Sequence, residues 1–212
     1  MADSAEPDII RWAGDIRAQA NALLHYSTNA YDRDRARRLI GIAAEMLAAG
    51  LHLPPAEVAA TFDRRIEVIT PLSVADAAVF DDEGRILLMQ RADNGLWAMP
   101  GGACEVGETA AESAVRELHE EVGLVGEAVA LFGIWDSQRH PSRTSFHLYM
   151  HVFLCRVVSG TPGPSSEALA AGYFAPDALP PLSYGHTVRV PAACTLYQAW
   201  RRDGYVVPFF DR

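Results

Sequence analysis

Three glutamates share one face of a helix near the middle of the chain. Glu117, Glu120 and Glu121 lie at positions i, i+3 and i+4, so an α-helix brings their carboxylates together. Like charges at this spacing destabilise a helix by roughly 0.2–0.5 kcal/mol per pair. A divalent cation would remove that cost, because Mg²⁺ and Mn²⁺ prefer carboxylate, carbonyl and water oxygens as ligands. The pattern is thus open to two interpretations, a metal site or a solvated acidic helix face.

The helix that carries these glutamates has clear start and stop signals. Thr109 is a good N-cap, and Glu112 three residues later completes a capping box. Gly123 follows the last periodic residue, as a left-handed C-terminal cap would. The apolar residues at helical spacing are Ala111, Ala114, Val115, Leu118 and Val122. The sequence therefore predicts a helix with one buried face and one acidic face.

The spacing of the whole stretch resembles the signature of the Nudix hydrolases. It reads Gly102, five residues, Glu108, seven residues, Arg116-Glu117-Leu118, one residue, Glu120-Glu121, one residue, Gly123-Leu124. The resemblance implies an α/β fold, an α/β/α sandwich around a mixed sheet. It also implies metal-dependent attack of water on a diphosphate linkage in a nucleoside diphosphate joined to a group X.

The resemblance assigns roles to the motif residues. The implied metal ligands are Glu117, Glu120, Glu121 and the backbone carbonyl of Gly101 or Gly102, and the implied cofactor is Mg²⁺ or Mn²⁺. Arg116 would pair with Glu108 and hold the loop against the helix, a structural role. In related hydrolases a glutamate before a later strand approaches the metals as a ligand or base, and Glu167 matches that place. The catalytic candidates are thus Glu120, Glu121 and Glu167.

Composition excludes several other classes of protein. The chain has 212 residues, half of them hydrophobic, and a net charge of −9. A non-specific nucleic-acid binder would show a basic stripe, so nucleic acid is not an expected partner. No run approaches the ~20 apolar residues of a membrane span, so no membrane partner is expected. The acidic start, Met1 to Pro7, shows no secretory signal, and we expect a cytoplasmic protein.

An N-terminal helical domain is expected over residues 1–66, followed by a catalytic domain over residues 67–212. Apolar periodicity predicts helices over about 9–24 and 32–49, and a short one from Pro55 to about Phe62. Leu23 to Asp32 reads Leu-Leu-His-Tyr-Ser-Thr-Asn-Ala-Tyr-Asp and resembles the N-terminal domain of a Nudix subgroup that hydrolyses such compounds as CDP-choline and ADP-ribose. In that subgroup the extension forms a homodimer and lies near the substrate pocket. Tyr26 and Tyr31 are candidates to stack on a base or face the partner, or else to pack the helical pair.

The catalytic domain is predicted to begin with a β-hairpin. Strands over 73–80 and 85–90 flank the turn Asp81-Asp82-Glu83-Gly84. The turn Asp93-Asn94-Gly95 then leads into the motif. Further predicted elements are strands over 129–135 and 146–158, a strand beginning at Tyr173-Phe174, and a helix over 190–202.

Two arginines in the polar loop 136–145 are candidate substrate ligands. Arg139 and Arg143 carry planar guanidinium groups, which grip a diphosphate bidentately, although a solvated turn would show the same residues. His186 stands where the subgroup commonly has an arginine, so substrate specificity can differ here.

Three functions remain in competition at this point. The first is hydrolysis of a nucleoside diphosphate-X substrate (ADP-ribose, CDP-choline or nucleotide-sugar type) to NMP and phospho-X. The second is a house-cleaning nucleoside triphosphate pyrophosphohydrolase. The third is a Nudix-like ligand-sensing transcriptional regulator; such proteins often lose the motif glutamates and add a basic helix. Here every motif glutamate is present, and the acidic neighbours Asp32 and Asp34 lower the net positive charge of the basic run Arg33 to Arg38.

Overall fold

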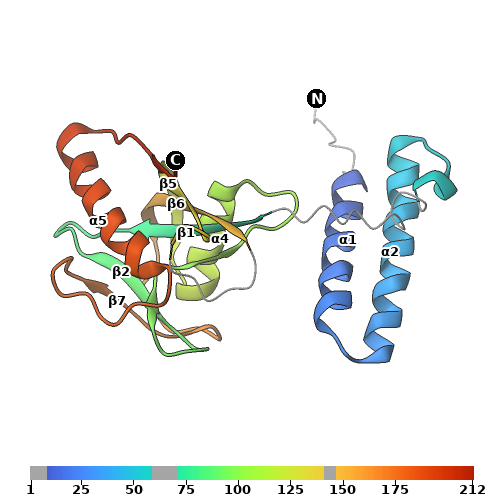
Figure 1. The fold of residues 1–212 in the computed structure, drawn as a ribbon, viewed down its shortest axis with the longest axis horizontal. Helices are drawn as coiled ribbons and strands as arrows, with labels where there is room; N and C mark the ends of the chain where they lie inside the picture. Colours follow the sequence, from blue (N-terminus) through green and yellow to red (C-terminus); the bar gives the residue numbers. More distant parts are fainter. Residues whose placement is uncertain (1–8, 59–70, 141–146) are drawn as a thin grey trace. The chain divides into compact units, whose positions relative to one another are not determined.

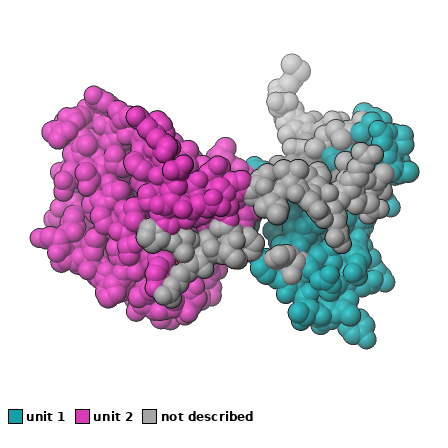
Figure 2. Space-filling view, viewed as in Figure 1, with its two compact units in different colours: residues 1–69, 105–107 teal, residues 70–104, 108–212 magenta. Residues whose placement is uncertain are grey.

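The computed structural model describes residues 9–58, 71–140 and 147–212 of the chain (Figure 1). These fall into two compact units, coloured separately in Figure 2. One unit holds residues 1–69 with 105–107, and the other holds residues 70–104 with 108–212. The expected domain boundary at residues 66 and 67 lies outside the described residues, and so does the end of the third expected helix.

The first unit is built on two helices, α1 (Ile9–Tyr26) and α2 (Ala30–Leu51). Asn29 caps α2, because its side chain accepts a hydrogen bond from the Tyr31 amide at 2.9 Å. The Arg33 guanidinium donates to the carbonyls of Leu24 and Ser27 and so ties the connection to the end of α1. Within the described part of this unit, a small core is formed by Ala44, Ala48 and Val58.

The second unit contains two sheets. The larger has the order β4-β1-β6-β5-β8, with β1 parallel to β6 and antiparallel to β4, so it is a mixed sheet. The smaller has the order β3-β2-β7. The strands are β1 (Leu72–Val79), β2 (Ile86–Arg91), β3 (Trp97–Ala98), β4 (Gly101–Ala103), β5 (Val125–Asp136), β6 (Leu148–Ser159), β7 (Ala168–Phe174) and β8 (Phe209–Phe210).

The prediction that β1 and β2 form a hairpin is wrong. A turn joins them, but they pair only through the isolated bridge between Phe80 and Ile86. Beyond that bridge β1 pairs with β4 and β6, whereas β2 pairs with β3 and β7. Side chains of both strands are buried, so each strand gains more by facing the core between the two sheets than by continuing the hairpin.

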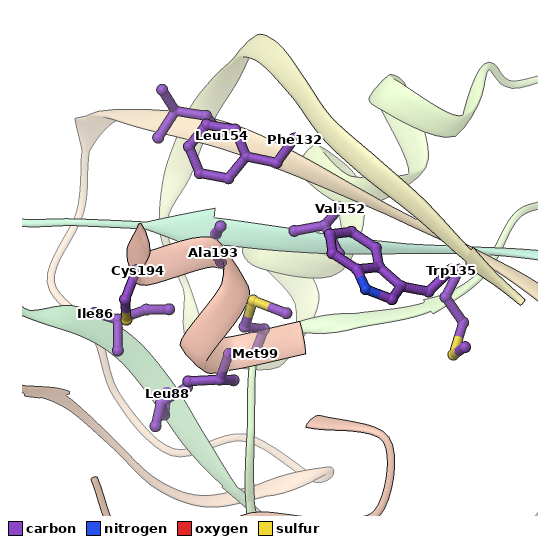
Figure 3. Close-up of a cluster of buried hydrophobic side chains, with 12 residues drawn as sticks. Ile86, Leu88, Met99, Phe132, Trp135, Val152, Leu154, Ala193 and Cys194 are labelled. Carbon is purple, nitrogen blue, oxygen red and sulfur yellow. The ribbon is translucent and has the colours of Figure 1, made fainter. Parts of the chain in front are cut away.

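The two faces of β1 pack against different helices. Ala75, Ala77 and Val79 face a core that includes Leu118 of α4 (Ala110–Val122). The alternate residue Ala78 belongs to the core under α5 (His186–Asp203). Figure 3 shows this second core, in which Ala193 and Cys194 of α5 lie among side chains of both sheets. The expected sandwich of helices around a mixed sheet is confirmed.

Some elements extend beyond their predicted bounds. β7 begins at Ala168 and ends at Phe174, and α5 begins four residues before the predicted start at residue 190. The C-terminal Phe209 docks in β8 beside β5 and stacks on Trp135, with ring centroids 4.8 Å apart. None of the helices in the described residues is long and apolar enough to cross a bilayer.

Candidate active site

The motif helix α4 is fixed at both ends by its own sequence. Thr109 Oγ1 accepts a hydrogen bond from the Glu112 amide at 3.2 Å, and the Glu112 carboxylate accepts one from the Thr109 amide at 2.7 Å. Gly123 ends the helix in the left-handed conformation, with φ 75°. The capping box and the C-cap therefore set where the glutamates of this helix point.

Arg116 organises the acidic side chains around it. Its guanidinium makes two hydrogen bonds to the Glu108 carboxylate, at 3.1 and 2.9 Å. It also donates to Glu117 at 2.8 Å and to Glu120 at 2.9 Å. A further bond to the Ala103 carbonyl reaches back to β4. One side chain thus holds the motif loop, the helix and three carboxylates together. These contacts raise the pKa of Arg116, and the hydrogen bonds to Glu108 contribute most to that rise.

Glu121 is the buried acid of the motif. Only 5% of its surface is exposed, and its carboxylate accepts a hydrogen bond from the Gly101 amide at 2.8 Å. Burial raises its pKa to about 8, and the Gly101 bond offsets part of that rise. Burial also raises the pKa of Glu117, with Arg116 opposing it. Glu120, in contrast, is more than half exposed.

The two glycines that precede the motif helix are required by close approach. A Cβ at Gly102 would lie 2.5 Å from Glu117 Oε1. A Cβ at Gly101 would lie 2.5 Å from the Ala75 carbonyl and 2.5 Å from Asp76 Oδ1. Only residues without a side chain allow the backbone of β4 to run this close to the acids and to β1.

These acids suit a hard divalent cation by their chemistry. Glu117, Glu121 and Glu167 interact electrostatically, because each of the other two contributes to raising the pKa of Glu121. Bringing such charges together in a desolvated place is costly without a cation. Among the described residues no three acidic, histidine or cysteine side chains already surround a common point. Two of the acids, Glu117 and Glu120, pair instead with Arg116, which supplies their counter-charge.

Two cavities flank this acidic region. The smaller, of about 300 Å³, is lined by Glu121, Glu167, Arg91 and Asp93 among others. The larger, of about 770 Å³, is lined by Gly101 and Gly102 and again by Arg91 and Asp93. Arg91 lies at the end of β2 and makes a bidentate pair with Asp93, at 2.9 and 2.7 Å. The positively charged guanidinium of Arg91 therefore lies where the acidic region meets the large cavity.

Buried charges in the large cavity were not singled out from the sequence. Asp76 and Arg189 are almost fully buried and form an ion pair at 2.8 Å, and His186 is buried beside them. A signal was available in the sequence, because Asp76 interrupts an apolar strand and Arg189 sits between two valines of a helix. Charged residues inside apolar runs are seldom buried without a partner or a function.

The structure does not place every predicted substrate ligand at this site. Arg139 is exposed in the turn after β5 and lines neither cavity. Arg143 lies outside the described residues. Tyr26 and Tyr31 belong to the helical unit, where both side chains are exposed. The roles of these four residues stay predictions.

Comparison with known proteins places the chain in a family. Residues 70–192 match the model of the NUDIX domain. Residues 7–62 match a model described as a UDP-X-like, N-terminal oligomerisation domain.

Similar proteins agree with these matches. The YjhB protein of Bacillus subtilis (strain 168) is 34% identical over 79% of this chain and 81% of its own length. The crystal structure of an ADP-ribose pyrophosphatase from Streptococcus suis 89-1591 is 35% identical, with a TM-score of 0.58, over 67% of this chain and 100% of that one. The crystal structure of a UDP-X diphosphatase is 27% identical, with a TM-score of 0.61, over 91% of this chain and 95% of that one. Motif, fold and relatives together establish that the chain belongs to the Nudix hydrolase family.

Proposed function

We propose that this protein hydrolyses the diphosphate linkage of a nucleoside diphosphate-X substrate to NMP and phospho-X. The observation that carries the proposal is the acidic region of half-buried Glu117 and buried Glu121, which lie against Gly101 and Gly102 in the wall of a cavity of about 770 Å³. Such a cavity has room for the groups on either side of a diphosphate. The names of the similar proteins, an ADP-ribose pyrophosphatase and a UDP-X diphosphatase, favour substrates of this class.

Glu117, Glu120, Glu121 and a carbonyl of Gly101 or Gly102 would hold Mg²⁺ or Mn²⁺. When bound, the cation neutralises the diphosphate and lowers the pKa of the attacking water. Glu120 is exposed and Glu167 lines the small cavity, so both are open to solvent and suited to accept the proton of that water. Arg116 and Glu108 keep the loop and helix in register and take no part in the chemistry.

Arg91 is proposed to bind the diphosphate. It is the basic residue that lines both cavities, and its guanidinium already binds one carboxylate bidentately. Two oxygens of a phosphate can accept the same pair of parallel N–H bonds that the Asp93 carboxylate accepts. When substrate binds, Arg91 would exchange the Asp93 carboxylate for a phosphate group. The substrate would then span the boundary between the acidic region and the large cavity.

The helical unit is proposed to form a homodimer. Its match to an oligomerisation domain supports self-association. On α2, Leu39 and Ile42 are both exposed, and their spacing of three residues puts them on the same face of the helix. Apolar side chains grouped in this way on a surface commonly mark an interface. We further infer that the enzyme is cytoplasmic, because nucleotide substrates and divalent cations are both present in the cytoplasm. We also infer that the boundary between the two domains lies at residues 66 and 67.

A hydrolysis screen tests the proposed function. Purified protein is incubated with Mg²⁺ or Mn²⁺ and ADP-ribose, CDP-choline, nucleotide sugars or nucleoside triphosphates, and products are identified by mass. Release of NMP and phospho-X, abolished in Glu121→Gln, is the expected result. Turnover of triphosphates alone would assign the pyrophosphohydrolase function instead. No turnover with either metal would overturn the enzyme assignment in favour of a ligand sensor.

A further inference from the structure

Three polar side chains form a cluster inside the large cavity. Asp76 of β1 and His186 and Arg189 of α5, here called the buried polar cluster, are only 2%, 6% and 5% exposed, and all three line the cavity. They stand apart from the motif glutamates, which lie on α4 against the other face of β1. The cluster is therefore a second polar feature of the site, which borders the acidic region at the Gly101 backbone.

The charges of the cluster leave hydrogen-bonding groups unused. Arg189 Nε donates to Asp76 Oδ2 at 2.8 Å, Nη1 contacts Met150 Sδ at 2.7 Å, and Nη2 contacts His186 Nε2 at 3.1 Å. A guanidinium has five N–H groups, so two remain. Asp76 Oδ1 accepts no hydrogen bond from any residue that the structure describes. An acceptor and two donors thus remain side by side at the cavity.

His186 adds a further unsatisfied group. Its Nδ1 faces the Met99 amide at 3.3 Å, and its Nε2 faces Arg189 Nη2 at 3.1 Å. Both neighbours are donors. Burial, together with the charge of Arg189, lowers the pKa of His186 well below its usual value, so the ring is neutral. A neutral imidazole has one N–H and one acceptor nitrogen, and hence one of the two nitrogens presents its N–H to a donor instead of an acceptor.

Stability does not explain this arrangement. A buried ion pair is on balance no more stabilising than apolar residues of the same volume, because desolvation offsets the attraction. The unused donors and acceptors instead face the cavity, where a ligand that supplied their missing partners would gain hydrogen bonds.

The walls of the cavity indicate the shape of that ligand. Val74, Leu96 and Leu148 supply apolar surface beside the polar cluster. Apolar walls with a polar end fit a planar ring that is recognised along its edge. The Watson–Crick edge of every nucleobase sets a donor next to an acceptor.

We propose that the buried polar cluster pairs with the edge of the substrate's nucleobase and thereby determines which nucleotide the enzyme accepts. The inference rests on the proposed function, and it adds the residues that select the base. The diphosphate would lie at Arg91 and the base would lie at the cluster, both within one cavity. Sites that hydrogen-bond a buried group reject analogues that lack it far more strongly than apolar pockets reject a change in size.

The test measures equilibrium binding of AMP, CMP, GMP, UMP and ribose 5-phosphate by calorimetry, without metal. His186→Asn is the main variant, because its side-chain oxygen can still accept from the Met99 amide while the atom at the Nε2 position is lost. His186→Gln restores a polar atom near that position and should recover part of the selectivity. Arg201→Gln is the control on the same helix, about 22 Å further along it.

The expected result is a preference of at least about tenfold for one or two of the four nucleotides over the others and over ribose 5-phosphate, which His186→Asn reduces by about tenfold. Ribose 5-phosphate should bind equally to wild type and all variants, and Arg201→Gln should match wild type. Asp76→Asn should also erase the preference. If that variant does not fold because Arg189 loses its partner, His186→Asn decides, since it breaks no ion pair.

Two results would overturn the inference: a wild type that binds all four nucleotides equally, or a preference that His186→Asn leaves unchanged. Neither result bears on the proposed hydrolysis, which the metal-dependent screen decides. Selective nucleotide binding with no turnover would leave the inference standing and remove the proposed function.

Discussion

Replacing Gly102 by alanine tests whether the position of Glu117 controls catalysis. The new Cβ would lie 2.5 Å from Glu117 Oε1 and 2.8 Å from its Cδ. Comfortable contacts of this kind settle near ~3.5 Å, so the carboxylate must retreat by about 1 Å. The backbone need not move, because the obstructing atoms are the end of a flexible side chain.

The expected loss is in turnover and not in folding. A misplacement of about 1 Å at a catalytic group costs on the order of 10²-fold in rate, so kcat should fall about 100-fold. The alanine stabilises the fold by about 0.5–1 kcal/mol through the unfolded state. Loss of the Glu117–Arg116 bond costs about the same. The melting temperature should therefore stay within about 4 °C of wild type.

The assay compares three glycine variants by steady-state kinetics, Mn²⁺ titration and calorimetry. Gly102→Ala should need more Mn²⁺ for half-maximal activity. Gly101→Ala should fail to fold, because its Cβ would meet the backbone of β1 at 2.5 and 2.7 Å. Gly163→Ala, whose Cβ would meet nothing within 4 Å, should behave as wild type. A folded Gly102→Ala with wild-type kcat and Mn²⁺ dependence would refute the placement of Glu117 among the metal ligands.

Three further predictions concern the motif glutamates and the exposed face of α2. Glu120→Gln and Glu121→Gln should each fold and lose most turnover with Mg²⁺ or Mn²⁺; near-normal kcat in both would contradict the metal assignment. The folded pKa of Glu121, about 8, is above its ordinary value of 4.5, so without metal its ionisation destabilises the fold progressively from about pH 4.5 to pH 8. With chelator present, Glu121→Gln should thus melt higher than wild type at pH 8–9 and by a much smaller margin at pH 5, and equal melting at both pH values would show that the carboxylate is not desolvated. Ile42→Arg on the exposed face of α2 should shift the protein from dimer to monomer in sedimentation without lowering the melting temperature of the second unit, whereas an unchanged sedimentation coefficient would exclude this face from the interface.

Local sequence was sufficient for the motif helix and its acids. The capping box of Thr109 and Glu112 and the glycine at 123 are short-range features, and all three are formed as the sequence predicts. Helical spacing alone puts Glu117, Glu120 and Glu121 on one face. The Nudix resemblance rests on the same fixed spacings, which is why the family and the reaction type could be read from one stretch of the chain.

Local sequence patterns did not predict which strands pair with each other. The segments of β1 and β2 look like a hairpin, since a turn joins two apolar strands. Their pairing is decided by partners far along the chain, β6 for β1 and β7 for β2. Such long-range pairing leaves no mark in the spacing of nearby residues.

The sequence by itself determined the family of this protein and the type of its reaction, and only the tertiary structure decided which distant residues line the large cavity. The acids of the motif lie within one helix, so their geometry follows from 3.6 residues per turn. Asp76, Arg91, His186 and Arg189 come from β1, β2 and α5, and they line one cavity only because two sheets and a helix pack together. The proposed selection of the substrate rests on these distant residues, whose burial and pairing exist only in the folded chain.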